Sequence, residues 1–447
     1  DIELLANAGV LANITSQWPL PWAGILTQLA RAPLSDTPAY VRKAAARVLA
    51  AGQAQTAHGF HAGLSADATN LPNVVRGFDA LGREDGQAQV TGEFMGDTTS
   101  IGVSLGAQYT HRMHHTQFLP DGSYAAQQIG GALVYGGTIT HWWGPGWISA
   151  LSLSNNARPF PQIGIERLDN TPFRSPWLNW IGPWQAEFFV GLLDGARVDR
   201  DTAYTGFRFS FNPLPGLEFA LARTTELCGR HHDCDPLAYF DIRNDDKHVN
   251  KTNDEGNLDF RYSRHLGGMP FEIYMQLMNE DSNPFWHSYT SHLYGGSIWV
   301  PFAGSPLRLT AEYTDTVPTV DIFSYGDLGH GAAYNNYDYV DGMRYRGRSL
   351  GASLDSDSRL LSFQGSWRAN NGFVYTLTYN HADVSSAQNR QLNVVTAAPV
   401  KINMGVARVA VPFRGFELDI EGRLQDDRPR PDHGKAAAIE VALKTNL

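Results

Sequence analysis

From about residue 55 to the end of the chain, apolar and polar side chains alternate with a period of two. In the stretch LEFALAR at residues 217–223, Leu217, Phe219 and Leu221 fall on one face of an extended segment, and the opposite face begins with Glu218. This pattern predicts β-strands with one apolar face, and it restricts the possible folds more than any other feature of the sequence. The alternation recurs at residues 271–277, 307–311, 373–379 and 416–421.

About nineteen such segments can be counted, many of them about ten residues long, which is the length that a strand needs to cross a bilayer. A long antiparallel series whose apolar face meets lipid must close on itself, because each unpaired backbone group in a bilayer costs several kcal/mol. We see no internal repeat at the period of a propeller or a solenoid. We therefore expect an all-β fold, a closed antiparallel transmembrane β-barrel in the bacterial outer membrane.

The first fifty residues have a helical pattern instead. The segment SDTPAYVRKAAARVLAAG begins with the cap candidate Ser35, carries apolar residues at helical spacing and stops at Gly52. DIELLANAG and PWAGILTQLARA predict two more short helices, and no run of about 18 apolar residues, the length of a transmembrane helix, occurs in the chain. We expect a small helical bundle at residues 1–53, which caps the periplasmic end, and a barrel with long extracellular loops at residues 54–447.

Loop lengths test the strand count. Outer-membrane barrels have short periplasmic turns and longer external loops, and this chain alternates short connections such as 266–268 with long ones such as 228–255. The alternation slips by one near residue 357 unless the candidate strand MRYRGRSLGA (343–352) belongs to an external loop. Assigning it to the loop leaves about eighteen strands, and an even number is expected for bacterial barrels.

Charge and cysteine content limit the partners and the compartment. The formal net charge of −10 argues against a nucleic-acid partner, which would require a basic face. The two cysteines, Cys228 and Cys234, predict a disulfide, while His231 and His232 between them leave a metal site as the alternative. The chain opens on DIELLANAG without the features of a signal peptide, so we expect that such a peptide has been removed if the protein is exported.

Two motifs suggest chemistry but have simpler explanations. GVSLG at 102–106 matches the hydrolase elbow G-x-S-x-G, yet Ser104 lies inside an alternating strand rather than at a strand-to-helix turn. The motif HRMHH places His111, His114 and His115 in a predicted external loop, where histidines are more often solvated than bound to metal. We expect no catalytic residue, no metal and no cofactor.

The predicted external loops are rich in side chains that suit sugars. Aromatic rings stack on sugar faces, and arginine donates hydrogen bonds to carboxylates or hydroxyls. An equally good interpretation is that these side chains pack the loops over the barrel mouth. The carbohydrate-binding candidates are Trp286, Tyr325, Tyr334, Tyr337, Tyr339, Arg344 and Arg346.

The segment HWWGPGWISALSLSNNARPFP (141–161) places three tryptophans around a Gly-Pro-Gly. Strand parity puts this turn, and also SPWLNWIGPW (175–184), at the periplasmic end, away from a surface sugar. Trp142 and Trp143 are consecutive in an extended segment, so one ring is expected to face lipid and the other the lumen. We favour an interfacial aromatic belt and a packing surface for the helical cap over a glycan site.

Several stretches together resemble the Wzi family of outer-membrane lectins in bacterial capsule assembly. They are DIELLANAGVLANITSQWPL at the N-terminus, the two tryptophan-rich segments, and YRGRSLGASLDSDSR at 345–359. The resemblance implies an eighteen-stranded outer-membrane barrel with a helical bundle at its periplasmic end, which holds polysaccharide at the cell surface. It assigns no catalytic or sugar-binding residue to this chain.

The sequence therefore predicts a non-enzymatic surface lectin that binds exported capsular or exopolysaccharide and attaches it to the cell surface. The expected surroundings are outer-membrane lipid and lipopolysaccharide, and we expect a monomer. The alternative is an outer-membrane channel for polysaccharide or small solutes, whose lumen Glu417, Asp419 and Glu421 would line. A hydrolase is disfavoured, because no set of nucleophile, base and orienting group can be assembled.

Overall fold

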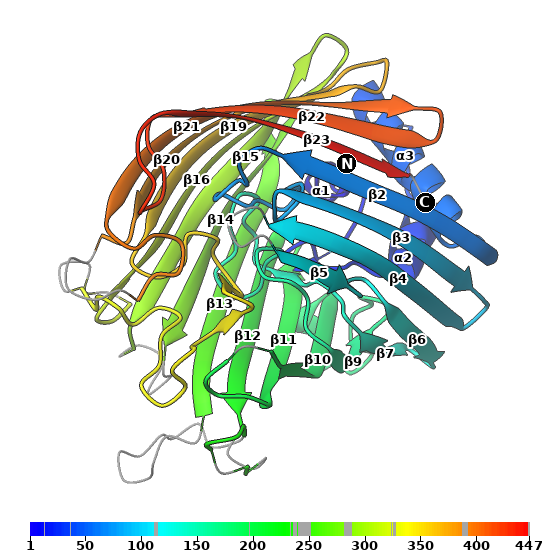
Figure 1. Cartoon of the computed structure of the whole chain (residues 1–447). Helices are drawn as coiled ribbons and strands as arrows, with labels where there is room; N and C mark the ends of the chain where they lie inside the picture. Colours follow the sequence, from blue (N-terminus) through cyan, green and yellow to red (C-terminus); the bar gives the residue numbers. More distant parts are fainter. Residues whose placement is uncertain are drawn as a thin grey trace.

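In the computed structural model the chain forms a closed antiparallel β-barrel with short helices gathered at one end (Figure 1). The structure describes residues 1–445 with gaps at 13, 36, 111–114, 196, 233, 236–238, 240–251, 281–287, 323, 325–327 and 387–391.

The barrel wall contains nineteen strand segments among the described residues. β5 and β6 both pair with β4, each along a different part of it, so they share one position and the wall has eighteen. Pairing of β23 with β2, from Ser65↔Lys444 to Thr69↔Glu440, closes the barrel. The predicted fold class and strand number are confirmed. The wall segments are β2 (Gly59–Thr69), β3 (Gly86–Met95), β4 (Thr99–Thr110), β5 (His115–Leu119), β6 (Tyr124–Ile129), β7 (Ala132–Gly137), β9 (Gln162–Arg167), β10 (Trp184–Leu193), β11 (Thr202–Leu214), β12 (Leu217–Leu227), β13 (Thr252–Leu266), β14 (Met269–Glu280), β15 (Thr290–Phe302), β16 (Ser305–Thr319), β19 (Arg359–Arg368), β20 (Val374–Val384), β21 (Val400–Phe413), β22 (Phe416–Gln425) and β23 (Ala436–Thr445).

The candidate strand MRYRGRSLGA lies outside the wall, as the loop lengths predicted. Its residues form β17 (Arg344–Tyr345) and β18 (Arg348–Ser349), which pair only with each other in a separate two-stranded sheet. The connection from β16 to β19 is therefore one long loop that contains its own hairpin.

The period-two pattern separates the outer and inner faces of the wall. On β12, Leu221 is half-exposed on the outer face, whereas Glu218 and Ala220 are buried on the inner face. On β22, Ile420 points outward and Asp419 is fully buried inside. Apolar side chains thus cover the surface that meets lipid, and polar side chains line the lumen.

The two ends of the barrel differ in the length of their connections. At one end, which we call the turn end, the joins are short, as at residues 215–216, 267–268, 303–304 and 414–415. At the opposite end, the loop end, the joins are long, as at residues 228–251 and 320–358. The predicted alternation of short turns and long loops is confirmed at these positions.

The helices α1 (Ile2–Asn7), α2 (Trp22–Leu29) and α3 (Ala39–Gln55) lie at the turn end. Their apolar faces form one cluster that includes Leu5, Ile25 and Val41, and Trp299 of β15 packs into the same cluster. None of the described helices has the length and apolarity needed to cross a bilayer.

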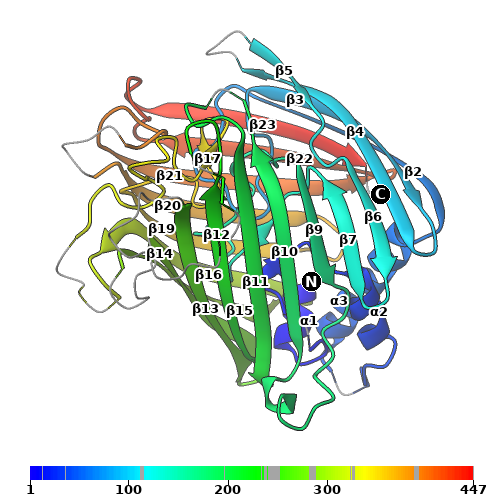
Figure 2. The ribbon, with the colours of Figure 1, turned by 90° about the horizontal axis from the view of Figure 1, so that it is seen from below.

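The tryptophan-rich segment 141–161 lies inside the lumen, which corrects the predicted periplasmic turn. The segment leaves β7 and enters β9 at the loop end, and β7 and β9 are short beside β10 and β11 (Figure 2). Inside, β8 (Trp142–Trp143) pairs with β1 (Gln17–Trp18) of the N-terminal segment. Both tryptophans are buried, so neither ring reaches lipid. The prediction of an interfacial ring was wrong because β8 is not a wall strand and has protein on both faces.

The second tryptophan-rich segment, 175–184, lies at the turn end as predicted, between β9 and β10. It contains a 3₁₀ turn, η2 (Asn179–Ile181). Trp177 is 86% exposed and Trp180 is also exposed. This position and exposure suit the aromatic belt that was predicted for both segments.

Candidate functional site

Acidic and amide side chains on the wall hold the segments that fill the lumen. Glu312 of β16 accepts hydrogen bonds from the backbone N–H groups of Trp147 (2.8 Å) and Ser149 (2.6 Å) and from the hydroxyl of Tyr274 (2.9 Å). Gln276 of β14 donates to the carbonyl of Trp143 at 3.0 Å and accepts from the N–H of Leu151 at 2.8 Å. These bonds fix segment 141–161 against the inside of the barrel.

The same kind of contact fixes the N-terminal segment. Glu187 of β10 accepts from the side-chain amide of Gln17 at 2.9 Å and from the indole of Trp143 at 3.3 Å. Glu218 of β12 accepts from the hydroxyl of Ser16 and from its backbone N–H. A buried carboxylate needs such donors, because an unpaired one would carry a large desolvation cost.

The acidic face of β22 is also occupied. Asp419 pairs with Arg408 at 2.8 Å, Glu421 with Arg423 at 2.6 Å and Glu417 with Lys444 at 2.8 Å. These carboxylates, which the sequence suggested as the lining of a channel, therefore bind cations of β22 itself and of the neighbouring strands β21 and β23.

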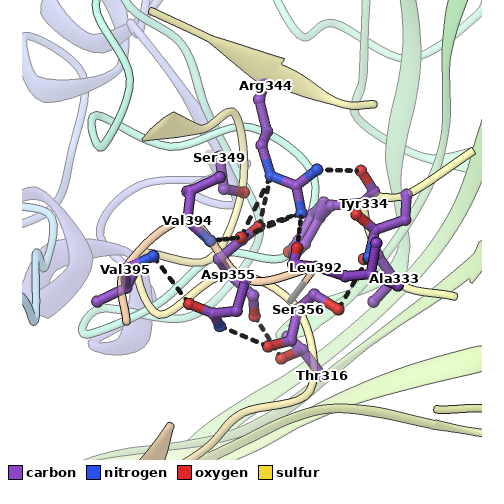
Figure 3. Close-up of polar contacts among 12 residues, drawn as sticks. Thr316, Ala333, Tyr334, Arg344, Ser349, Asp355, Ser356, Leu392, Val394 and Val395 are labelled. Atoms are coloured by element: carbon purple, nitrogen blue, oxygen red, sulfur yellow. Dashed lines mark hydrogen bonds and ion pairs between the residues drawn. The ribbon is translucent and has the colours of Figure 1, made fainter. Parts of the chain in front are cut away.

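At the loop end, a buried ion pair holds the long loop 320–358 (Figure 3). The guanidinium of Arg344 contacts both carboxylate oxygens of Asp355 at 3.0 and 3.2 Å and donates to the carbonyls of Tyr334 (3.1 Å) and Leu392 (2.9 Å). Asp355 also accepts from the N–H of Val394 at 2.7 Å. One ion pair thus joins the loop 320–358 to the loop 385–399. We call these two loops together the lid.

A second set of contacts joins the lid to the loops after β10 and β12. Tyr339 stacks on His232 with ring centroids 3.9 Å apart, and its hydroxyl donates to the carbonyl of Cys228. Burial raises the pKa of Tyr339 above its usual value, so this hydroxyl stays protonated. Cys228 and Cys234 form the predicted disulfide, which closes the loop that carries His232.

Three of the carbohydrate-binding candidates have structural roles. Tyr334 and Tyr339 are fully buried, and Arg344 is buried in its pair with Asp355. The hydroxyl of Tyr334 donates to the carbonyl of Leu151, which connects the lid to the segment in the lumen. These side chains present no surface to a saccharide in this structure, because the lid encloses them, so for them the alternative interpretation of loop packing applies.

Two candidates face solvent. Tyr337 is 94% exposed, and Arg346 is partly exposed while it contacts Asp194 at 3.4 Å. Trp286 and Tyr325 lie outside the described residues, as do His111 and His114 and the side chain of His115.

A comparison with protein families gives a clear result. The model of the family described as capsule assembly protein Wzi matches residues 57–428, which is most of the chain. The chain belongs to the Wzi family.

Two related proteins agree with membership of the Wzi family. A 55.8 kDa protein in the cps region of Klebsiella pneumoniae is 23% identical over 301 residues, which cover 66% of this chain and 59% of that relative. Wzi of Escherichia coli, an outer membrane protein involved in group 1 capsule assembly and a carbohydrate-binding β-barrel, has a similar structure. The TM-score is 0.86 at 18% identity, with 100% of this chain and 97% of that chain covered. This likeness shows the fold, and with the apolar outer face it places this Wzi-family chain in the bacterial outer membrane.

One aromatic side chain at the loop end was missed by sequence reasoning. Tyr289 is 44% exposed and its ring lies over Gly329, where an added Cβ would be 2.2 Å from the ring. The ring therefore lies against the long loop of this Wzi-family barrel. The sequence did not predict this contact, because Tyr289 and Gly329 are far apart along the chain. The glycine alone was a local sign that something packs closely there.

Neither a hydrolase centre at Ser104 nor a metal site is supported by the described residues. Ser104 lies in β4 with its hydroxyl 2.9 Å from that of Thr91. Within the described part of the chain, no group of three His, Cys, Asp or Glu side chains is arranged to hold a metal ion.

Proposed function

We propose that this protein is a non-enzymatic outer-membrane lectin, whose loop end binds exported capsular or exopolysaccharide and attaches it to the cell surface. Membership of the capsule assembly family supports this proposal, and so does the carbohydrate binding described for Escherichia coli Wzi. The observation that carries it is a lumen occupied by the chain's own segments beneath a lid held by buried ion pairs. A barrel filled in this way offers a surface for a polymer rather than a passage.

The binding face would be the loop end, because long loops face outward and short turns face the periplasm in barrels of this class. There, the exposed ring of Tyr337 can stack on a sugar, and Arg346 can donate hydrogen bonds to its hydroxyl or carboxylate groups. We keep Trp286 and Tyr325 as proposed contacts from their place in the sequence. The proposed setting is a monomer surrounded by outer-membrane lipid and lipopolysaccharide.

The test compares Tyr337→Ala with Tyr337→Phe in cells and in a binding assay with the cognate exopolysaccharide. Loss of a stacking contact worth about 1 kcal/mol should lower the affinity roughly fivefold and reduce surface retention, whereas the phenylalanine variant keeps the ring and should bind like the parent. If the unaltered protein shows no affinity for the polysaccharide, with or without calcium, the lectin function is refuted.

A further inference from the structure

A chamber of about 510 Å³ lies at the turn end, between the helices and the barrel wall. Its helical side includes Trp22 of α2 and Arg47 of α3, and its wall side includes Arg368 at the end of β19. Trp18 and Trp147 also line it. This volume lies within the range of sites that bind small molecules, about 300–1,000 Å³.

The rings in the chamber are held in place and remain partly open. Trp18 contacts Phe78 edge to face at 5.0 Å, and Phe78 stacks on Trp147 at 4.6 Å. The indole of Trp22 donates to the side chain of Gln55 at 2.6 Å. All three tryptophans are half-buried. The ring of Trp147 is covered by Phe78 and by the guanidinium of Arg308, 4.3 Å from its centroid, so the ring surface left for a ligand belongs to Trp18 and Trp22. Fixed aromatic rings beside open space suit the stacking of a sugar ring.

Of the three arginines in the lining, one has no close carboxylate in the part of the chain that the structure describes, since Asp79, the remaining acidic side chain of the lining, lies 3.7 Å from Arg408. Arg308 is committed to Glu3 at 2.9 Å and Glu272 at 3.3 Å, and Arg47 to Asp1 at 2.8 Å. Arg368 has no carboxylate within 4.0 Å among the described residues, and it makes a 3.4 Å hydrogen bond to the carbonyl of Gly372. A half-buried guanidinium without a counter-ion can bind a carboxylate with two parallel hydrogen bonds.

A smaller cavity of about 60 Å³ adjoins the chamber and shares Trp147 with it. Its wall carries Gln364 of β19 and Thr378 and Asn380 of β20. The volume is enough for about four waters, at about 15 Å³ each, and the hydroxyl and amide groups of the lining stand beside the charged side chains of Arg408 and Glu421.

We propose that this chamber is a second saccharide site, which binds an acidic sugar unit with its carboxylate on Arg368 and its ring against Trp18 and Trp22. The site is separate from the loop end and does not rest on the lectin function proposed above. A position at the turn end means that it takes saccharide from the side opposite to the lid.

The test is calorimetric titration of the full chain in detergent with tri-galacturonic acid and, as the neutral comparison, maltotriose. We expect binding of the acidic trisaccharide that is weakened at least tenfold by Arg368→Gln, whereas binding of maltotriose, where measurable, is unchanged by that variant. Heat-dependent gel mobility confirms that each variant is folded.

Arg414→Gln is the matched control, because it makes the same change at an exposed arginine in the turn between β21 and β22, outside the lining of the chamber. It should bind tri-galacturonic acid like the parent. The proposal is overturned if the parent does not bind the acidic trisaccharide, or if folded Arg368→Gln protein binds it as well as the parent does.

Discussion

At the scale of single residues, Trp143 shows how the lumen is held together. Its ring is fully buried and lies 5.5 Å from the ring of Phe189, and its backbone pairs with Gln17. Glu187 accepts a hydrogen bond from its indole. One residue thus connects the lumen segment, the N-terminal segment and the wall.

Replacement of Trp143 by alanine should destabilise the barrel by about 3–5 kcal/mol, the usual cost of removing a large buried aromatic side chain. Polysaccharide binding at the loop end should change less than stability does. Denaturant unfolding of the folded protein measures the first effect and a glycan-binding assay the second. Trp177→Ala, at an 86% exposed position, is the control and should have little effect on unfolding. A Trp143 variant with normal stability and lost binding would contradict the assigned packing role.

At the scale of elements, the lid depends on the pair between Arg344 and Asp355. Both side chains are buried, so removal of one charge leaves the other without a partner, at a cost of about 3–5 kcal/mol. The pair between Arg346 and Asp194 is about 40% exposed on both sides, and such pairs contribute at most about 1 kcal/mol. Arg344 and Arg346 are only two residues apart, yet the ion pair of Arg344 contributes far more to stability than the ion pair of Arg346.

Asp355→Asn should release the lid while the barrel wall stays folded. We expect faster limited proteolysis within residues 320–358 and 385–399, together with unchanged heat-dependent gel mobility. Asp194→Asn removes an acidic partner of the neighbouring arginine and should leave the proteolysis rate close to that of the parent. Equal protection of the two variants would show that the buried pair does not hold the lid.

At the scale of the whole molecule, three segments occupy the lumen from different directions. The N-terminal segment enters from the turn end, and residues 70–85 and 138–161 enter from the loop end. Arg76 and Ile148, from these two loop-end segments, line the same small cavity. Removal of one segment therefore leaves two others in place.

The intact protein should show no steady ion conductance in a planar lipid bilayer. Deletion of residues 1–52 should raise the conductance only to a level far below that of an open barrel of this size, because residues 70–85 and 138–161 remain inside. Single-channel recording of the two proteins checks this. A steady, porin-like conductance of the intact protein would favour the channel function over the lectin function.

Much of the architecture follows from local sequence patterns. The period-two alternation of segments such as 217–223 marks wall strands, because adjacent side chains of a strand must face either lipid or lumen. The helices at the N-terminus, the disulfide between Cys228 and Cys234 and the removal of 343–352 from the wall were also predictable from spacing and loop length.

The placement of the lumen segment and the burial of individual loop side chains depended instead on contacts between residues that are distant in the sequence. Strand parity misplaced segment 141–161, because the wall strands beside it are short and its backbone is held inside by Glu312 and Gln276, more than a hundred residues away. Tyr334 and Tyr337 look alike in sequence, yet only Tyr337 is exposed. By itself the sequence determined a closed barrel with a helical end, since the alternation is a property of each strand alone. Only the tertiary structure decided which aromatic and charged side chains are enclosed and which can meet a ligand, because burial depends on what the rest of the chain places against each of them.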